Sequence, residues 1–242
     1  MNEKTLPHIK AKPGEIAENV IAVGDPGRVK ILAELLDDYK VVNEHRGLLV
    51  ITGNYKDIRV SIATHGMGCP SAAIVFEELG MLGARKITRL GTAGGMREDL
   101  EIGDIVVATG AAYTRGGCGL GQYMPEACAP TSPDPVLTTK IMEKLSGTGT
   151  RFYSGPVFSS DAFYAEDPGF AKKWSSRGVI AVEMEAAILF ALGWMRGWRT
   201  AAVLVISDNL LSEKEEFATS EELKEKINIA AKAVLEAYRS LK

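Results

Sequence analysis

The residues Gly24 and Arg28 form part of a candidate anion site, because they flank a turn that follows the apolar run 20–23. Gly24 permits a close backbone approach, and Pro26 favours the start of a helix that has Arg28 in its first turn. Free N–H groups at a helix N-terminus attract a phosphate, and a guanidinium adds a charge-assisted hydrogen bond. The alternative is that Asp-Pro-Gly makes an ordinary turn.

A second candidate anion site lies at 89–95, Arg-Leu-Gly-Thr-Ala-Gly-Gly, where the apolar run 86–90 ends. It offers the guanidinium of Arg89, the hydroxyl of Thr92 and a glycine-rich backbone, although a plain turn with a solvated arginine has the same composition. Two such segments at strand ends can converge on one phosphate. A third segment, 66–71, has the form Gly-x-Gly-x-x-Ser of a dinucleotide site, but the acidic residue expected about 20 positions later is missing.

Two carboxylates, Glu183 and Glu185, stand where a strand is expected to give way to an apolar helix. Side chains two residues apart do not face each other on a helix, so a paired-carboxylate or two-metal site is disfavoured and we expect one of the two to reach a ligand. An ionised carboxylate accepts two hydrogen bonds, which suits adjacent sugar hydroxyls. The alternative is a first-turn Glu that the helix dipole favours.

Asp208 follows the apolar run 200–206 and the hydroxyl of Ser207. Desolvation at a strand end raises the pKa of a carboxyl, which can then donate a proton near neutral pH as a general acid. An Asp that only forms a turn is the alternative. The segment 159–164 adds the rings of Phe163 and Tyr164, which suit stacking on a planar ligand unless they belong to the core.

Alternating strands and helices must position these groups. Consecutive apolar and β-branched residues predict buried strands at 20–23, 48–52, 58–64, 86–90, 105–109, 179–182 and 200–207. Helices are expected at 26–36, 70–82, 135–146 and 185–195, three of them with Pro in the first turn. A last helix is expected to begin at a capping box formed by Thr219 and Glu222. Its apolar stripe consists of Leu223, Ile227, Ala230, Val234 and Tyr238. The pattern predicts an α/β fold: one three-layer α/β/α domain over residues 1–242, with a central sheet that is mostly parallel or mixed.

Composition excludes several classes of protein. The chain has 28 Lys and Arg against 31 Asp and Glu, a net charge of −3, and 46% hydrophobic residues, which excludes a disordered chain. It has no Lys/Arg-dense segment for nucleic acid and no apolar run of about 18 residues for a membrane span. Residues 1–12 lack the apolar core of a signal peptide. We therefore expect a cytoplasmic protein that binds neither nucleic acid nor membrane.

The three cysteines, Cys69, Cys118 and Cys128, show neither Cys-x-x-Cys spacing nor a neighbouring His, so no metal site is predicted. Free cysteines are usually buried. A second hypothesis is that Cys118 or Cys128, in a Gly- and Pro-rich loop, forms a disulfide between two chains. A single monomer band on non-reducing electrophoresis, after purification under oxidising conditions, would dispose of that bridge.

Seven segments, in this order and at this spacing, resemble the nucleoside phosphorylase family of trimeric and hexameric enzymes. They span nearly the whole chain and comprise Pro7-His8-Ile9, Gly24-Asp25-Pro26-Gly27-Arg28, Asn43-Glu44-His45-Arg46-Gly47, Arg89-Leu90-Gly91-Thr92, Phe158-Ser159-Ser160-Asp161-Ala162-Phe163-Tyr164, Val182-Glu183-Met184-Glu185-Ala186-Ala187 and Ser207-Asp208. The likeness is greatest to archaeal purine nucleoside and methylthioadenosine phosphorylases.

This resemblance implies phosphorolysis of a purine ribonucleoside, such as adenosine, inosine, guanosine or 5′-methylthioadenosine. The reaction is a pentosyltransferase step of purine salvage. Inorganic phosphate, as co-substrate, attacks the anomeric carbon and releases the free base and ribose 1-phosphate. No metal or organic cofactor is implied.

The resemblance also implies a role for each matching residue. The phosphate ligands would be Gly24, Arg28, Arg89, Thr92 and, supplied by the neighbouring subunit, Arg46. The ribose site would contain Glu185, Met184, Glu183 and, also from the neighbour and near the 5′ position, His8. Phe163 would flank the base, and Asp208, positioned by Ser207, would protonate or hydrogen-bond purine N7. Shared sites imply a homo-oligomer, with a hexamer built as a trimer of dimers expected.

Departures from the family pattern bear on the substrate. Uridine phosphorylases carry a Gln and an Arg shortly after the Phe-Tyr pair, whereas here Ala165-Glu166-Asp167-Pro168 follow Tyr164, which disfavours pyrimidines. Asn209 stands where several bacterial purine enzymes have His, which leaves the choice between 6-amino and 6-oxo purines open. His8 suits either a 5′-hydroxyl or a methylthio group.

Three alternatives are weighed against a purine phosphorylase: a uridine phosphorylase, a hydrolytic nucleosidase of the same fold, and a non-catalytic nucleotide sensor. A nucleosidase uses water and should lack the ring of Arg28, Arg46 and Arg89. A sensor built on the 66–71 loop leaves Asp208 and Glu185 unexplained.

Overall fold

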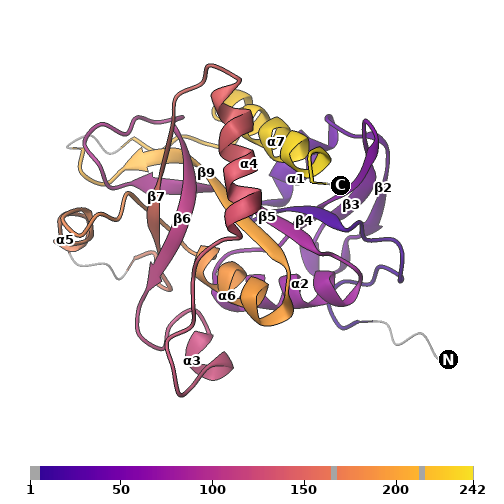
Figure 1. The fold of residues 1–242 in the computed structure, drawn as a ribbon, viewed down its shortest axis with the longest axis horizontal. Coiled ribbons are helices and arrows are strands. Elements are labelled where there is room, and N and C mark those ends of the chain that lie inside the picture. Colours follow the sequence, from indigo (N-terminus) through magenta and orange to yellow (C-terminus); the bar gives the residue numbers. More distant parts are fainter. Residues whose placement is uncertain (1–5, 165–167, 213–215, 242) are drawn as a thin grey trace.

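One nine-stranded sheet runs through the computed structural model, which describes residues 6–164, 168–212 and 216–241 (Figure 1). Its strands are β1 (Asn19–Val23), β2 (Asp37–Asn43), β3 (Val50–Tyr55), β4 (Ile58–Thr64), β5 (Lys86–Gly95), β6 (Ile105–Tyr113), β7 (Phe152–Ser159), β8 (Ala181–Glu183) and β9 (Arg199–Asn209). The α-helices are α1 (Pro26–Ala33), α2 (Cys69–Met81), α3 (Leu120–Tyr123), α4 (Pro135–Ser146), α5 (Phe170–Ser175), α6 (Ala186–Arg196) and α7 (Lys224–Arg239).

The sheet is mixed, as predicted. Its order is β2-β3-β4-β1-β5-β8-β7-β6-β9, and β9 also pairs with β5, so the strands from β5 onward close into a ring of pairings. Strand β1 lies parallel to both β4 and β5, and β5 lies parallel to β9. These parallel pairs bring several strand ends to one edge of the sheet, where ligand sites form in α/β folds.

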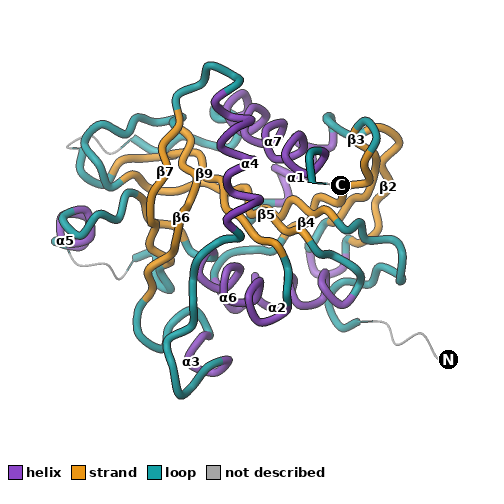
Figure 2. The backbone as a smooth tube through the Cα atoms, in the orientation of Figure 1, coloured by secondary structure: helices purple, strands orange, loops and turns teal. Residues whose placement is uncertain are grey.

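Helices cover both faces of the sheet, which confirms the three-layer α/β/α prediction (Figure 2). Helices α2 and α6 pack together on one face, while α4 and α7 pack together on the other with α1 beside α7. The side chains of β1 are buried on both faces of the sheet. Val20 and Ala22 join the core under α2 and α6. Ile21 and Val23 join the core under α1 and α7. Side chains of a strand point to opposite faces in turn, so an all-apolar strand is stable only between two layers.

Strands β5 and β9, which carry candidate site residues, run further than the sequence predicts. Strand β5 continues to Gly95 and β9 continues to Asn209, and the two pair along this length. The segment 91–95 is therefore strand and not the expected glycine-rich turn. Its glycines make room for side chains instead, because a Cβ at Gly91 would lie 2.6 Å from the Arg89 guanidinium and one at Gly94 would lie 3.1 Å from the Asp208 carboxylate.

Other elements also differ from the prediction. Helix α1 ends at Ala33 rather than at residue 36. Strand β2 was not predicted, because residues 37–41 are exposed and carry no alternating apolar pattern. The short helices α3 and α5 were likewise missing from the expected elements. Such elements depend on pairing with distant segments, which local periodicity does not report.

The last helix confirms its sequence signals. The backbone N–H and hydroxyl of Thr219 both donate to Glu222 Oε2 at 2.8 Å, so the capping box forms, and regular α-helix begins at Lys224. All five residues of the predicted stripe are buried. Tyr238 donates its hydroxyl to the Val20 carbonyl at 2.7 Å and thereby ties α7 to β1.

Gly80 of α2 provides a stability test of the packing between α2 and the turn before β9. A Cβ at Gly80 would overlap the indole ring of buried Trp198. We expect Gly80→Ala to lower the free energy of unfolding by about 1–3 kcal/mol or more, since an overpacked core must shift backbone or ring. Gly147→Ala is the control, because its Cβ would meet no atom closer than 3.4 Å at an exposed helix end. Equal denaturant midpoints for the two variants would contradict the prediction.

Among the described residues, none of the helices is both long and apolar enough to cross a membrane. Residues 1–5, part of the segment in which the sequence shows no signal-peptide core, lie outside the described residues.

Candidate active site

Arg89 of β5 lies at the centre of the candidate site, between two carboxylates. Its Nε is 2.8 Å from Glu183 Oε2, and its Nη2 is 2.6 Å from Glu185 Oε2. All three side chains are buried. Burial alone would lower the pKa of Arg89, but the charges of Glu185 and Glu183 outweigh burial and raise it. The guanidinium is therefore a permanent positive charge in the interior, held in place by both acids.

Glu183 and Glu185 both contact Arg89 but have different roles, and the expectation that one of the two reaches a ligand stays a prediction. Glu183 ends β8 and caps α6: its Oε2 accepts the backbone N–H groups of Glu185 and Ala186 at 2.8 and 2.9 Å. Its other oxygen, Oε1, accepts from the Ser159 hydroxyl. The first-turn alternative is not met, because α6 begins at Ala186 and Glu183 caps it from the end of β8. Glu185, at the N-cap of α6, has no such role in capping and turns its carboxylate to Arg89.

The loop after β4 positions Glu185, which the sequence did not reveal. Gly68 donates its backbone N–H to Glu185 Oε1 at 2.6 Å, with both Gly66 and Gly68 at positive φ. Gly66 has no room for a Cβ beside the Ser71 hydroxyl, which donates to the His65 carbonyl at 2.7 Å. The glycines of the Gly-x-Gly-x-x-Ser segment thus serve a carboxylate contact, and a dinucleotide is not needed to explain them.

His65 is a second residue that the sequence did not single out. It is fully buried, and its Nε2 lies 3.3 Å from Arg89 Nη1. Burial and the charge of Arg89 hold the pKa of His65 well below its usual range, so the ring is neutral and accepts from the guanidinium. The signal was available in the sequence, because His65 directly follows a predicted strand.

Arg28 of α1 lies beside β5, the strand that carries Arg89. Its Nη1 donates to the Leu90 carbonyl at 3.4 Å and its Nη2 to Thr92 Oγ1 at 3.5 Å, both long contacts. Burial, together with the positive charge of Arg89, lowers the pKa of Arg28 to about 10. Two buried guanidinium groups that repel each other favour an anion between them.

One part of the predicted anion cradle is wrong. Asp25 caps α1 by accepting the Gly27 N–H at 2.8 Å, and the Arg28 N–H bonds to the Asp25 carbonyl at 3.0 Å. These two amides are therefore not free for a phosphate, since the helix supplies its own cap. Gly24 itself lies against the His65 loop, where a Cβ would come within 3.3 Å of the Gly66 carbonyl. The cradle consists of the guanidinium groups and this close backbone approach.

Asp208 lies across β5 from Glu183. Gly94 of β5 pairs with Asp208 on one side and with Val182 on the other, so the two acids approach from strands that flank the same residue. Burial raises the pKa of Asp208, and the Ser207 hydroxyl, which donates to Asp208 Oδ1 at 2.7 Å, offsets part of that rise. The raised pKa agrees with the prediction of a desolvated acid, and Ser207 holds it as expected.

Three predicted residues do not join this cluster within one chain. His8 is bound through Nδ1 to Glu78 of α2 at 2.7 Å, and Arg46 is exposed at a φ of 59° in a short 3-10 turn, His45–Gly47. The Phe163 ring is 59% exposed and packs edge-on against Tyr164, so it belongs to no core. Met184 is half-buried, between the two acids in the sequence.

Asn209 and the segment after Tyr164 are the two places where the sequence departs from the family pattern in a way that bears on the substrate. The Asn209 amide donates to the Arg97 and Leu100 carbonyls at 2.8 Å each, so its side chain fixes the loop before β6. Residues 165–167, on which the argument against pyrimidines rests, lie outside the described residues.

The burial of Cys118 contradicts one half of the hypothesis that Cys118 or Cys128 forms a disulfide between two chains. Cys118 is buried and its thiol faces the Ser159 carbonyl, so it is not available to a second chain. Cys128 is exposed, and the bridge stays a prediction for that residue. Possible metal ligands lie beside this site and are considered below.

Comparisons with known proteins agree with this geometry. The sequence matches the family described as Phosphorylase superfamily over residues 18–241. It is 34% identical to a guanosine phosphorylase of Halorubrum lacusprofundi over 97% of this chain and 98% of that protein. It is 40% identical to a DeoD-type purine nucleoside phosphorylase of Exiguobacterium sp. over 89% of this chain and 90% of that protein.

The fold has solved counterparts as well. The crystal structure of uridine phosphorylase from Vibrio fischeri ES114 superposes with a TM-score of 0.87 at 28% identity, covering 98% of both chains. The agreement in fold and the family match extend over almost the whole sequence. This chain belongs to the phosphorylase superfamily.

Proposed function

We propose that this chain is a purine nucleoside phosphorylase, a pentosyltransferase that cleaves purine ribonucleosides with phosphate to give free base and ribose 1-phosphate. One observation carries the proposal: the guanidinium groups of Arg28 and Arg89 are buried close to each other, Arg89 pairs with the carboxylate of Glu185, and Asp208 lies on β9, which pairs with the strand of Arg89. Full-length relatives named as purine or guanosine phosphorylases support it.

In this proposal phosphate accepts hydrogen bonds from the Arg89 guanidinium, including from Nη2, which contacts Glu185 in this structure. The Glu185 carboxylate, still oriented by the Gly68 N–H, is then free to accept from the ribose 2′ and 3′ hydroxyls. Arg28, Thr92 and the backbone at Gly24 would complete the phosphate site. Glu183 keeps Arg89 in position throughout, because its carboxylate is committed to α6.

Cleavage of the glycosidic bond passes through an oxocarbenium-like state. A phosphate held beside the anomeric carbon would stabilise that positive charge electrostatically. Asp208 would protonate or hydrogen-bond N7 of the leaving purine, with Met184 against the sugar and Phe163 against the base. Inorganic phosphate is the co-substrate, and the reaction as proposed uses no organic cofactor or metal.

A homo-oligomer is part of the proposal. His8 and Arg46 do not join the cluster of their own chain, while both are at least partly exposed and thus available to a neighbour. A hexamer built as a trimer of dimers would let each chain complete the site of another. A catalytically competent monomer by light scattering would contradict this. Cytoplasmic location stays a prediction from the sequence.

A uridine phosphorylase is the second candidate, since solved uridine phosphorylases share the fold at 28–29% identity. The test is base release from methylthioadenosine, adenosine, inosine, guanosine and uridine, each with and without phosphate. Phosphate-dependent release from purines is the expected result and ranks the 6-amino, 6-oxo and 5′ preferences. Release without phosphate would indicate a nucleosidase, release from uridine alone a uridine phosphorylase, and tight purine binding without turnover a sensor.

A further inference from the structure

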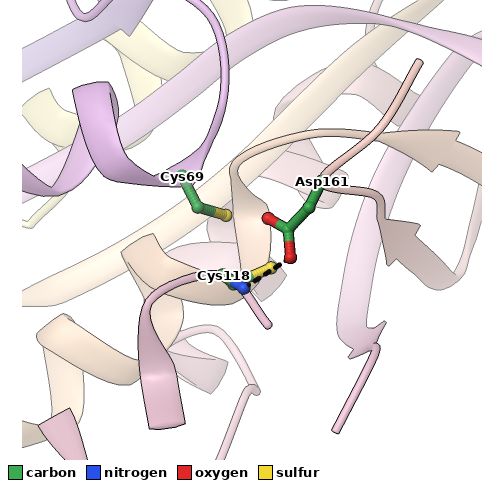
Figure 3. Close-up of side chains that lie close together, drawn as sticks. All are labelled: Cys69, Cys118 and Asp161. Atoms are coloured by element: carbon green, nitrogen blue, oxygen red, sulfur yellow. Dashed lines mark hydrogen bonds between the residues drawn. The ribbon is translucent and has the colours of Figure 1, made fainter. Parts of the chain in front are cut away.

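Two thiols and a carboxylate from distant parts of the chain meet beside the candidate site (Figure 3). Cys69 is the first residue of α2, Cys118 lies in the loop between β6 and α3, and Asp161 follows β7. Their sulfur and oxygen atoms all lie within 4.8 Å of one another. The proposed phosphorolysis uses none of the three.

The backbone around Cys118 is shaped to bring this group together. Cys118 has a φ of 56°, and its N–H donates to Asp161 Oδ2 at 2.8 Å. A Cβ at Gly117 would collide with the same carboxylate oxygen. This contact occupies one lone pair of Asp161, and Figure 3 shows its other oxygen on the side of the Cys69 sulfur. A non-glycine residue at positive φ costs free energy and persists only where the surrounding contacts impose it.

One of the three side chains lies at the surface of the molecule. Cys69 and Cys118 are buried, whereas Asp161 is exposed and lies at the rim. The Cys69 thiol donates to the Met184 carbonyl at 3.1 Å and the Cys118 thiol to the Ser159 carbonyl at 3.7 Å. An ion entering past Asp161 would meet both sulfurs.

We propose that Cys69, Cys118 and Asp161 bind one Zn²⁺, with water in a fourth position. Two thiolates and a carboxylate are the donor types that this borderline cation takes, and three protein ligands leave a tetrahedral site open at one corner. Binding releases two thiol protons to solvent and replaces the two thiol–carbonyl contacts with metal–sulfur bonds. Affinity should rise with pH, because cysteine binds a metal ion as the thiolate.

The site would join three segments near the substrate. Cys69 follows Gly68, which holds Glu185, and Asp161 precedes Phe163 by two residues. A bound ion would fix the start of α2 to the loop that carries Phe163. This inference does not depend on the proposed function, because the ligand set stands apart from Arg28, Arg89 and Asp208.

Cobalt and cadmium substitution tests the site on the full-length chain, reduced and freed of metal with a chelator. We expect sulfur-to-metal charge-transfer absorption that saturates at one equivalent, is displaced by Zn²⁺, and is accompanied by a rise in the thermal unfolding midpoint. Cys118→Ser and Asp161→Asn should each weaken binding about tenfold or more. Cys128→Ser, a change at an exposed cysteine outside the cluster, should leave binding unchanged.

Asp161→Asn keeps an oxygen that can accept from the Cys118 N–H, so it tests ligation even if Cys118→Ser folds poorly. Absence of the charge-transfer band in the wild type, or equal affinity in Asp161→Asn and wild type, would overturn the proposal. Loss of metal binding in the Cys128→Ser variant would also overturn the proposal. If metal fails to bind and mild oxidation instead removes two hydrogens and links Cys69 to Cys118 in peptide mapping, the pair is a disulfide-forming site and not a metal site.

Discussion

Replacement of Asp208 with Asn is expected to reduce turnover of inosine or adenosine by about 10²–10⁴-fold, the usual effect of removing a general acid. The amide keeps the shape of the side chain and a hydrogen-bond partner for Ser207 but supplies no readily transferred proton. Phosphate binding should change little, because the proposed phosphate site is formed by Arg28 and Arg89, whereas Asp208 is bound to the Ser207 hydroxyl. Steady-state kinetics with saturating phosphate would measure the loss.

The pH dependence gives this prediction a second readout. Burial raises the pKa of Asp208, so its proton is present to higher pH than on an ordinary Asp. Wild-type turnover should fall as pH rises through that raised pKa, because the acid then loses its proton. The amide of the variant cannot titrate, so Asp208→Asn should lack this limb of the profile.

Stability separates a catalytic effect from misfolding. A carboxyl whose pKa is raised on folding destabilises the native state once pH exceeds its unfolded pKa, and this cost grows until pH passes the folded pKa. Asp208→Asn removes the cost, so its unfolding midpoint at neutral pH should equal or exceed that of the wild type. Near wild-type turnover in a well-folded variant would refute the role of Asp208 as acid.

Replacement of Arg89 with Met is expected to have the largest combined effect on stability and activity. It leaves Glu183 and Glu185 buried without their common cation. Removal of one partner of a buried ion pair typically lowers the free energy of unfolding by about 3–5 kcal/mol. Loss of a preorganised donor to the reacting phosphate should also reduce turnover by about 10²–10³-fold. Denaturant titration and phosphate-dependent kinetics measure the two effects.

A second substitution tests the reason for the instability. Glu185→Gln in the Arg89→Met background removes one uncompensated charge while keeping an acceptor for the Gly68 N–H, so it should recover part of the stability without restoring activity. Arg97→Met is the matched control, because its ion pair with Asp99 is exposed and contributes at most about 1 kcal/mol. A loss of stability no larger for Arg89→Met than for Arg97→Met would show that the buried network does not stabilise the fold.

The amino-acid sequence alone determined the elements whose signals are local. Buried strands such as β1 and β9 show as apolar runs, and the capping box before α7 lies within four consecutive residues. The candidate residues Arg28, Arg89, Glu185 and Asp208 were found in the same way, because each lies close to the end of an apolar strand or the start of a helix. Backbone preference and side-chain periodicity are properties of neighbouring residues, so a single sequence reports them.

Which of these groups meet depends on how distant segments pack in the folded chain. Arg89 and Glu183 are 94 positions apart, and nothing local indicates that both acids would enclose one guanidinium. The extension of β5 to Gly95 depends on pairing with β9, and Gly68 contacts Glu185 across 117 positions. The cysteine spacing pointed away from metal, yet folding places Cys69, Cys118 and Asp161 together. Contacts of this kind arise when distant strands and loops pack around a common core, and the free energy that selects them belongs to the whole fold rather than to any segment.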